Sequence, residues 1–199
     1  MKAIEMSDSK IKSDEGYYDF DMLYSKYYLR VSYFIKNSIG GIYEDAENIA
    51  QEAFMIFFKK LNGGVDGCEL TFEDEKSAVS YIYQIARNLI QNHNRKSYFR
   101  KMVDNLYLFF QTGGVDHEKY DEVELKTDFD MALNKLPETY REVIMLKYIS
   151  EFSCEQISKI LQISEGTVKS RYFNGSAKMA TILKEYDKTA EKKKADEND

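Results

Sequence analysis

The segment LPETYREVIMLKYISEFSCEQISKILQISEGTVKSRYFNGSAK, residues 136–178, contains three successive helix-start signals. Pro137 suits the first turn of a helix, because its fixed φ is pre-set for that turn and its missing N–H is not needed there. Ser153 and Gln156 have the spacing of a capping box, in which each side chain satisfies a backbone N–H at a helix start. Ser164 can cap a further helix that begins at Glu165. This segment is therefore predicted to form helices joined by tight turns, as in a helix-turn-helix.

The last helix of this segment has an apolar and a polar side. Its apolar residues recur at steps of four, three and four, and are expected to pack on the preceding helix: Val168, Tyr172, Gly175 and Met179. The opposite side is polar and flanked by cations. Cations that hold phosphates beside short polar side chains that read base edges are what a DNA-reading helix needs. A helical hairpin with a solvated face fits the pattern equally well, and the pattern alone does not choose between them.

Three further amphipathic stripes precede this segment, and alternating β-branched residues are scarce. They run from Phe20 to Phe34, from Ala46 to Leu61 and from Ala78 to Leu89, and the first two are followed by glycine pairs. Three such stripes predict one helical bundle. The expected fold is all-α, with two small helical domains.

We expect five parts along the chain. Residues 1–16 form a flexible N-terminus, and residues 17–101 form the helical bundle. Residues 102–130 lack sustained periodicity and are acid-rich, so they are predicted to be an acidic flexible linker, in which the apolar residues 106–110 could form a short helix. Residues 131–184 form the helix-turn-helix domain, and residues 185–199 a charged flexible tail.

Composition argues against several classes of protein. No apolar run approaches the ~18 residues of a membrane span, and residues 1–16 lack the apolar core of a secretory signal, so we expect a cytoplasmic protein without membrane insertion. Cys68 and Cys154 lie far apart with no Cys/His cluster, which argues against a metal site. His93 and His117 have no spaced partners and no Gly-rich phosphate loop occurs, so we expect neither a catalytic residue nor a cofactor, and no enzymatic activity.

Charge is distributed unevenly along this chain, whose net charge is −6. Residues 79–101 carry five cations and no acid, and they include the aromatic stretch YIYQIARN, residues 81–88. Aromatic rings beside cations suit single-stranded DNA, because bases stack on the rings while cations follow the backbone. Ile82, Ile85 and Leu89 are assigned to the core, whereas Tyr81 and Tyr83 stay open between core packing and base stacking.

The second stripe carries an acidic, polar face away from its apolar residues, formed by Glu44, Asp45, Glu47, Asn48, Gln51 and Glu52. Such a face can be merely solvated, or it can dock on a basic partner. Charge alone does not choose between these two interpretations.

Together these features resemble a bacterial RNA polymerase sigma factor of the sigma-70 family, of the extracytoplasmic-function (ECF) type, which has regions 2 and 4 without the folded domain between them. EDAENIAQEAF, residues 44–54, resembles the core-polymerase-binding helix of region 2. Residues 81–88 resemble the helix that engages the −10 element. Residues 136–143 and 166–171 resemble region 4, which reads the −35 element. The resemblance covers about residues 20–100 and 130–184.

The resemblance implies that the chain binds core RNA polymerase, directs it to promoters and assists promoter opening, with an anti-sigma factor as a further partner. Core polymerase would be bound by Asp45, Asn48, Gln51 and Glu52. The melted −10 strand would be bound by Tyr81, Tyr83, Arg87, Asn88, Arg95 and Lys96. The −35 duplex would be bound by Thr167, Lys169, Ser170, Arg171, Asn174 and Lys178.

The chain departs from the family pattern at several positions. Tyr81 stands where the family usually has Trp, Gln162 replaces a customary Gly in the turn, and residues 62–77 form a longer, acidic loop where the family holds a flipped promoter base. Relatives continue with several Arg and His residues after Arg171, whereas residues 172–177 of this chain contain no cation. This difference predicts that region 4 alone binds DNA weakly and that tethering by polymerase supplies affinity. Two alternatives stay open: a stand-alone helix-turn-helix regulator, and a sigma-like protein that binds polymerase or an anti-sigma factor without reading promoters.

Overall fold

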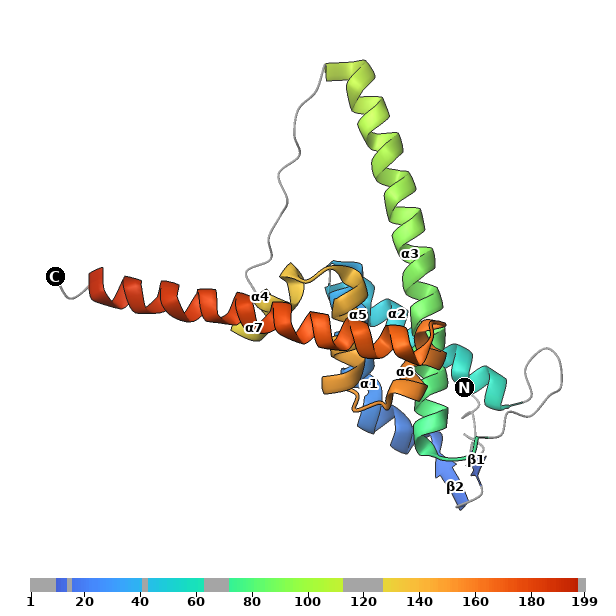
Figure 1. The fold of residues 1–199 in the computed structure, drawn as a ribbon. Helices are drawn as coiled ribbons and strands as arrows, with labels where there is room; N and C mark the ends of the chain where they lie inside the picture. Colours follow the sequence, from blue (N-terminus) through green and yellow to red (C-terminus); the bar gives the residue numbers. More distant parts are fainter. Residues whose placement is uncertain (1–9, 14–15, 41–42, 63–71, 113–126, 197–199) are drawn as a thin grey trace.

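Helices dominate the computed structural model, which describes residues 10–13, 16–40, 43–62, 72–112 and 127–196. Seven helices and one hairpin lie in these ranges (Figure 1). Their bounds are β1 Lys10–Ser13, β2 Gly16–Asp19, α1 Phe20–Ile39, α2 Tyr43–Leu61, α3 Glu75–Thr112, α4 Asp128–Lys135, α5 Glu138–Tyr148, α6 Cys154–Leu161 and α7 Glu165–Asp196. The predicted all-α fold is confirmed, with the hairpin as an addition.

The helix starts follow the capping signals in the sequence. Ser153 and Gln156 form the reciprocal capping box, with the Gln156 N–H donating to Ser153 Oγ at 3.1 Å and the Ser153 N–H donating to Gln156 Oε1 at 3.0 Å. Ser164 Oγ accepts from the Thr167 N–H at 3.1 Å at the start of α7. At the end of α1, Gly40 adopts φ +84°, a conformation that glycine reaches without steric cost. The start of α5 after Pro137 is as predicted.

The first half of the chain folds as a three-helix bundle. Helices α1, α2 and α3 pack on one another around buried apolar residues: Leu23, Val31, Phe34, Ala50, Phe54, Phe57 and Ile82. Ile85 is buried as predicted, whereas Leu89 is only half-buried and its neighbour Ile90 is buried instead.

The second half packs α7 across α5 and α6, with α4 beside it. Its core contains Leu133, Val143, Ile144, Leu146, Ile157, Leu161 and Val168. Gly175 allows the close approach of α7 to α5, because a Cβ built there would lie 3.1 Å from Tyr140 Cβ and 3.3 Å from Ile144 Cγ1.

Four predicted boundaries need correction. Strand β1 falls within residues 1–16, where a flexible terminus was predicted, and Lys10 pairs with Asp19 in the hairpin. Helix α3 continues to Thr112, so the predicted linker start at residue 102 lies inside a helix, and α4 already begins at Asp128. Helix α7 continues to Asp196 through the predicted tail. Both extensions follow from cooperativity, since adding a residue to a formed helix costs little, and neither residues 102–112 nor residues 185–196 contain a glycine or proline.

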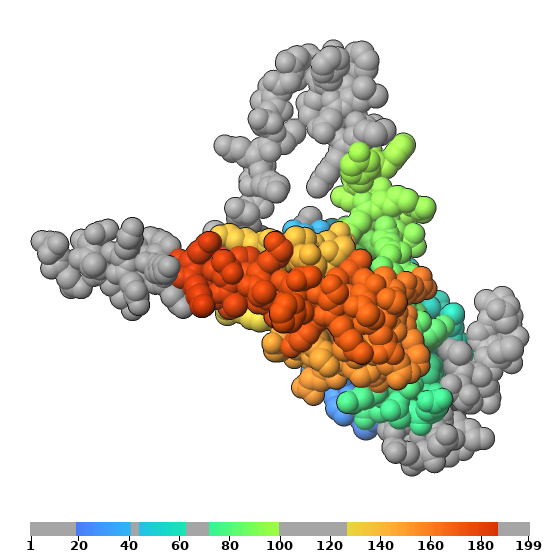
Figure 2. Space-filling model, viewed as in Figure 1, coloured from blue at the N-terminus to red at the C-terminus, as the bar shows by residue number. Residues whose placement is uncertain are grey.

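The two halves lie against each other rather than apart. Helix α6 packs on α3 and α5 packs on α1 (Figure 1). In Figure 2 the orange and red surface of the second half covers the centre of the molecule. None of the described helices is long and apolar enough to cross a membrane.

Candidate functional site

The polar face of α2 is open to solvent. Asn48, Gln51 and Glu52 are exposed and Asp45 is half-buried, with its Oδ2 3.9 Å from His93 Nε2. The opposite face of α2 is buried against α1 and α3. The four residues predicted to bind polymerase therefore lie together on one accessible helix face.

Met55 extends this face and was missed in the sequence analysis. Its side chain is 54% exposed, although the residue is apolar and lies between the buried Phe54 and Phe57. The signal was its position three residues after Glu52 and four after Gln51, which places it on the same side of the helix.

The aromatic stretch of α3 divides into two environments. Tyr81 is half-buried between Phe57 and Phe72, and its hydroxyl accepts a hydrogen bond from Lys60 Nζ at 2.7 Å. Tyr83 is fully buried, packs edge-on against Phe34 with ring centroids 5.3 Å apart, and its pKa is raised by burial. Part of the Tyr81 side chain is therefore accessible, whereas Tyr83 is enclosed.

What covers Tyr83 comes from the second half of the chain. Ser150 Oγ donates to the Tyr83 hydroxyl at 2.7 Å, and the Phe152 ring meets the Tyr83 ring edge-to-face at 5.1 Å. Phe152 is 2% exposed and Ser150 is 9% exposed. An apolar residue in a short connection between helices was the signal for this contact, but the sequence does not tell which surface Phe152 meets.

Arg87 also faces the second half. Its Nε lies 3.8 Å from Oε1 of Glu142 on α5, and this buried Nε has no hydrogen-bond partner among the described residues. Burial raises the pKa of the Glu142 carboxyl even though Arg87 opposes that shift. The other predicted −10 residues, Asn88, Arg95 and Lys96, are exposed farther along α3.

Further polar contacts join α1 to the second half. The Tyr33 hydroxyl donates to the Asp130 carboxylate at the start of α4, and Arg141 Nη1 donates to the Asn37 carbonyl at 2.9 Å. Burial would by itself raise the pKa of Asp130, but the hydrogen bonds from Tyr33 and Thr127 lower it. These contacts and those on α3 form one continuous interface between the halves.

The outward face of α7 is accessible. Lys169, Ser170, Asn174 and Lys178 are exposed. Thr167 and Arg171 are half-buried, so Arg171 lies at the edge of this face. The face also presents Phe173, which is 74% exposed, and Lys169 lies 3.7 Å from Glu165, so part of its charge is already compensated. The predicted −35 residues thus share one helix, and no cation lies between Arg171 and Lys178.

The turn before α7 contains the predicted departure at Gln162. This residue adopts φ +54° and ψ +44°, the left-handed conformation in which glycine is the customary residue. A side chain with a Cβ meets a steric cost in this conformation, which glycine does not.

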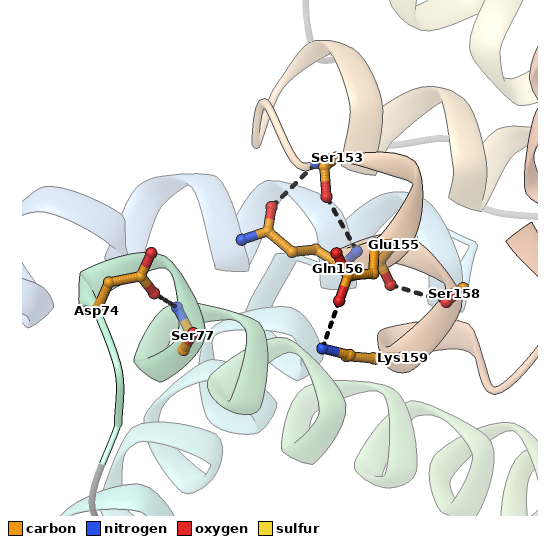
Figure 3. A network of polar contacts seen from close by, with 7 residues as sticks. All are labelled: Asp74, Ser77, Ser153, Glu155, Gln156, Ser158 and Lys159. Atoms are coloured by element: carbon orange, nitrogen blue, oxygen red, sulfur yellow. Dashed lines mark hydrogen bonds and ion pairs between the residues drawn. The ribbon is translucent and has the colours of Figure 1, made fainter.

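Polar residues near the start of α6 form caps rather than a reactive centre. Figure 3 shows the Ser153–Gln156 capping box and the Glu155–Lys159 ion pair at 2.8 Å. The Ser158 hydroxyl donates to the Glu155 carbonyl. At the start of α3, the Ser77 N–H donates to the Asp74 carboxylate at 2.7 Å. Each contact joins residues three or four positions apart. Among the described residues, no group of three or more His, Cys, Asp and Glu side chains is placed to hold a metal ion.

Comparisons with known proteins agree with this architecture. The family model of sigma-70 region 4 matches residues 126–179. The ECF RNA polymerase sigma factor SigW of Bacillus subtilis is 31% identical over 157 residues, which are 74% of this chain and 79% of SigW. RNA polymerase sigma factor SigV of the same organism is 29% identical over 162 residues, covering 81% of this chain and 86% of SigV.

Solved structures give the same result. The sigma factor RpoE from Bartonella quintana, crystallised with the anti-sigma factor NepR, superposes with a TM-score of 0.59 and 25% identity over 83% of this chain and 96% of that one. CnrH, solved with the cytosolic domain of CnrY, shares the fold with a TM-score of 0.54 and 18% identity, covering 83% and 87% of the two chains.

Proposed function

Because the chain belongs to the family of ECF RNA polymerase sigma factors, we propose that it binds core RNA polymerase, directs it to specific promoters and assists their opening. It would act in the cytoplasm as a regulatory factor without catalysing a reaction itself. The observation that carries this proposal is the simultaneous exposure of the polar α2 face and the outward α7 face on one chain.

The α2 face has the composition of a protein-docking surface. Asp45, Asn48, Gln51 and Glu52 offer carboxylates and amides, which suit a basic and hydrogen-bonding partner, and core polymerase is the partner proposed. Met55 adds an apolar contact beside them, and methionine is enriched in protein interfaces. This combination supports docking over mere solvation of the face.

The two DNA contacts are assigned to separate helices. Lys169, Ser170 and Asn174 of α7 would approach the −35 duplex, with Thr167, Arg171 and Lys178 at the margins of the contact. The −10 strand would follow α3 along Tyr81, Arg87, Asn88, Arg95 and Lys96, with Tyr83 joining only where the halves have separated. Few phosphate contacts on α7 mean weak binding by region 4 alone, since affinity and its salt dependence follow the number of phosphates neutralised.

An anti-sigma factor is the proposed further partner. Its support is the fold shared with RpoE, which was solved bound to an anti-sigma factor. The identity of such a partner would come from purification of complexes formed by this chain.

Reconstitution with core polymerase tests the proposal. Promoter-dependent transcripts from the DNA upstream of the chain's own gene are expected, and Asn48→Ala with Gln51→Ala should abolish both core binding and transcription. Glu155→Ala with Lys159→Ala is the matched control, because it also removes two exposed polar side chains from one helix, which is α6 and not α2.

Two outcomes would replace the proposal by its alternatives. Stable, sequence-specific duplex binding without core polymerase would establish a stand-alone regulator. Core binding with no transcripts from any template would establish an interaction protein that does not read promoters.

A further inference from the structure

We propose that the outward side of α7 reads A·T base pairs of the −35 duplex, with the Asn174 amide on an adenine and the Phe173 ring on a thymine methyl group. This inference rests on the proposed function and adds the identity of the bases to it. The side chains concerned belong to one stripe of α7, the reading stripe, formed by Gly166, Ser170, Phe173, Asn174 and Ala177.

The reading stripe is open along one side of α7. Its members recur at steps of three or four residues, so they lie above one another on the helix surface, and all five are exposed. The other side of α7 packs on α5 and α6, where Val168, Gly175 and Met179 are buried. A helix that is packed on one side and open on the other can lay its open side in the major groove, which is wide enough to admit a helix.

Phe173 gives the reading stripe an apolar group that the fold does not use. Its side chain is 74% exposed, and leaving an aromatic ring in water forgoes the free energy of burying it. The thymine methyl is the apolar group that base edges present in the major groove, and phenylalanine and alanine side chains contact it. Ala177 lies four residues after Phe173 and is also exposed. Both residues therefore suit contact with thymine.

Asn174 matches the hydrogen-bonding pattern of an adenine edge. Adenine offers N6–H as a donor and N7 as an acceptor, and an asparagine amide pairs with both, through Oδ1 and Nδ2 respectively. Asn174 Nδ2 donates to Ser170 Oγ at 3.5 Å, and among the described residues the amide has no other partner. One Nδ2 proton and Oδ1 thus stay available for adenine. Guanine carries the acceptor O6 in place of N6–H, so the same pose would set two acceptors against each other.

The cations of α7 are poorly placed to read guanine, which arginine and lysine bind through O6 and N7. Lys169 Nζ lies 3.7 Å from the Glu165 carboxylate, which compensates part of its charge. Arg171 is half-buried beside the packed side of the helix. Burial raises the pKa of the Glu142 carboxyl, and Arg171 is among the cations that oppose this rise, so its charge is directed toward α5. Lys178 lies at the margin of the stripe, where it suits a phosphate.

The test uses the holoenzyme that the full chain forms with core polymerase, on the promoter upstream of the chain's own gene with its −35 element randomised. Sequencing of the DNA that the holoenzyme retains gives the base preference at each position. The variants are Asn174→Arg and Asn174→Ala. Ala180→Arg is the matched control, because it adds the same charge to an exposed position of α7 outside the reading stripe. Circular dichroism and a core pull-down verify that each variant is folded and docks.

The wild type should prefer adenine to guanine by about tenfold at the position that Asn174 contacts, as expected for one bidentate pair. Asn174→Arg should change this preference to guanine, because arginine pairs with O6 and N7, and Asn174→Ala should remove it. Ala180→Arg should keep the preference for adenine and strengthen binding to all sequences alike, since added charge acts on phosphates.

A second measurement isolates Phe173. Replacing thymine by uracil in the selected −35 element removes only the methyl group, which should weaken binding of the wild-type holoenzyme by about fourfold, the effect of burying one such group. Phe173→Ala should bind the thymine and uracil forms more nearly equally. An unchanged thymine-to-uracil ratio in Phe173→Ala would overturn the contact of the ring with the methyl group.

A guanine preference in the wild type, or a base preference that both Asn174 variants leave unchanged, would overturn the readout of A·T pairs while leaving the proposed function intact. Core binding without selection at any position of the −35 element would instead refute promoter reading, and the base readout with it.

Discussion

The hydrogen bond between Tyr83 and Ser150 gives a sharp test of how the two halves pack. Both hydroxyls are buried and lie 2.7 Å apart, although 67 positions separate the two residues in the chain. Tyr83→Phe leaves the Ser150 hydroxyl without its partner, and Ser150→Ala does the same to Tyr83. Each single change should lower the free energy of unfolding by about 1–3 kcal/mol, the cost of an unsatisfied buried polar group.

The double variant should cost less than the sum of the two single changes, because it leaves no orphaned hydroxyl. The expected coupling is roughly 0.5–3 kcal/mol, as for residues in direct contact. Urea unfolding of the full chain, followed by circular dichroism, measures all four corners of the cycle.

Tyr172→Phe serves as the control for the loss of a tyrosine hydroxyl. Its hydroxyl donates to Tyr148 at 3.3 Å on the surface, so this change should alter the stability by less than about 0.5 kcal/mol. The packing of the halves would be refuted if the Tyr83 and Ser150 changes were strictly additive, or if each had as little effect as Tyr172→Phe.

Three further predictions concern single positions. Gly175→Ala should lower the midpoint of thermal unfolding, because the new Cβ would lie 3.3 Å from Ile144 Cγ1. Gly166→Ala should instead raise the stability by about 1 kcal/mol, because no atom outside its own helix turn lies nearer than 3.8 Å to the new Cβ. The reverse order of the two effects would contradict the contact between α7 and α5. Gln162→Gly should raise the urea midpoint and increase the free energy of unfolding by up to about 1 kcal/mol, because glycine adopts φ +54° without a steric cost from a Cβ. A lower urea midpoint would show that the Gln162 side chain stabilises the turn. Burial raises the pKa of the Glu142 carboxyl above its ordinary value, so the folded chain binds more protons than the unfolded chain in the pH range just above that value. This group therefore lowers the free energy of unfolding as the pH rises through that range. Glu142→Gln should remove this part of the pH dependence in urea unfolding, and an unaltered dependence would contradict it.

Local signals were sufficient for most of the helix starts and for the choice of fold class. Pro137, Ser153 and Ser164 act on backbone groups within one helical turn, so a short stretch of sequence is enough to predict these helix starts. Gly40 was predicted to end α1 for the same reason. The ends of α3 and α7 were misplaced because periodicity and charge do not determine how far a helix propagates once it has formed.

The candidate site was predicted in part. The exposed face of α2 and the outward face of α7 follow from helical periodicity, since residues three and four apart share one side of a helix. Met55 belongs to the first face by the same rule, although the sequence analysis did not single it out. Periodicity gives the side of the helix and not whether a neighbouring element covers it.

The sequence by itself determined that this chain forms two helical units, with caps, turns and amphipathic faces at defined residues. Only the tertiary structure decided that Tyr83 is buried and that Arg87 faces Glu142, because their partners lie on the other half of the chain. Caps and periodicity depend on interactions within one or two helical turns. A contact such as that of Phe152 with Tyr83 depends on which surfaces of the two halves pack together, and no pattern of neighbouring residues determines that choice.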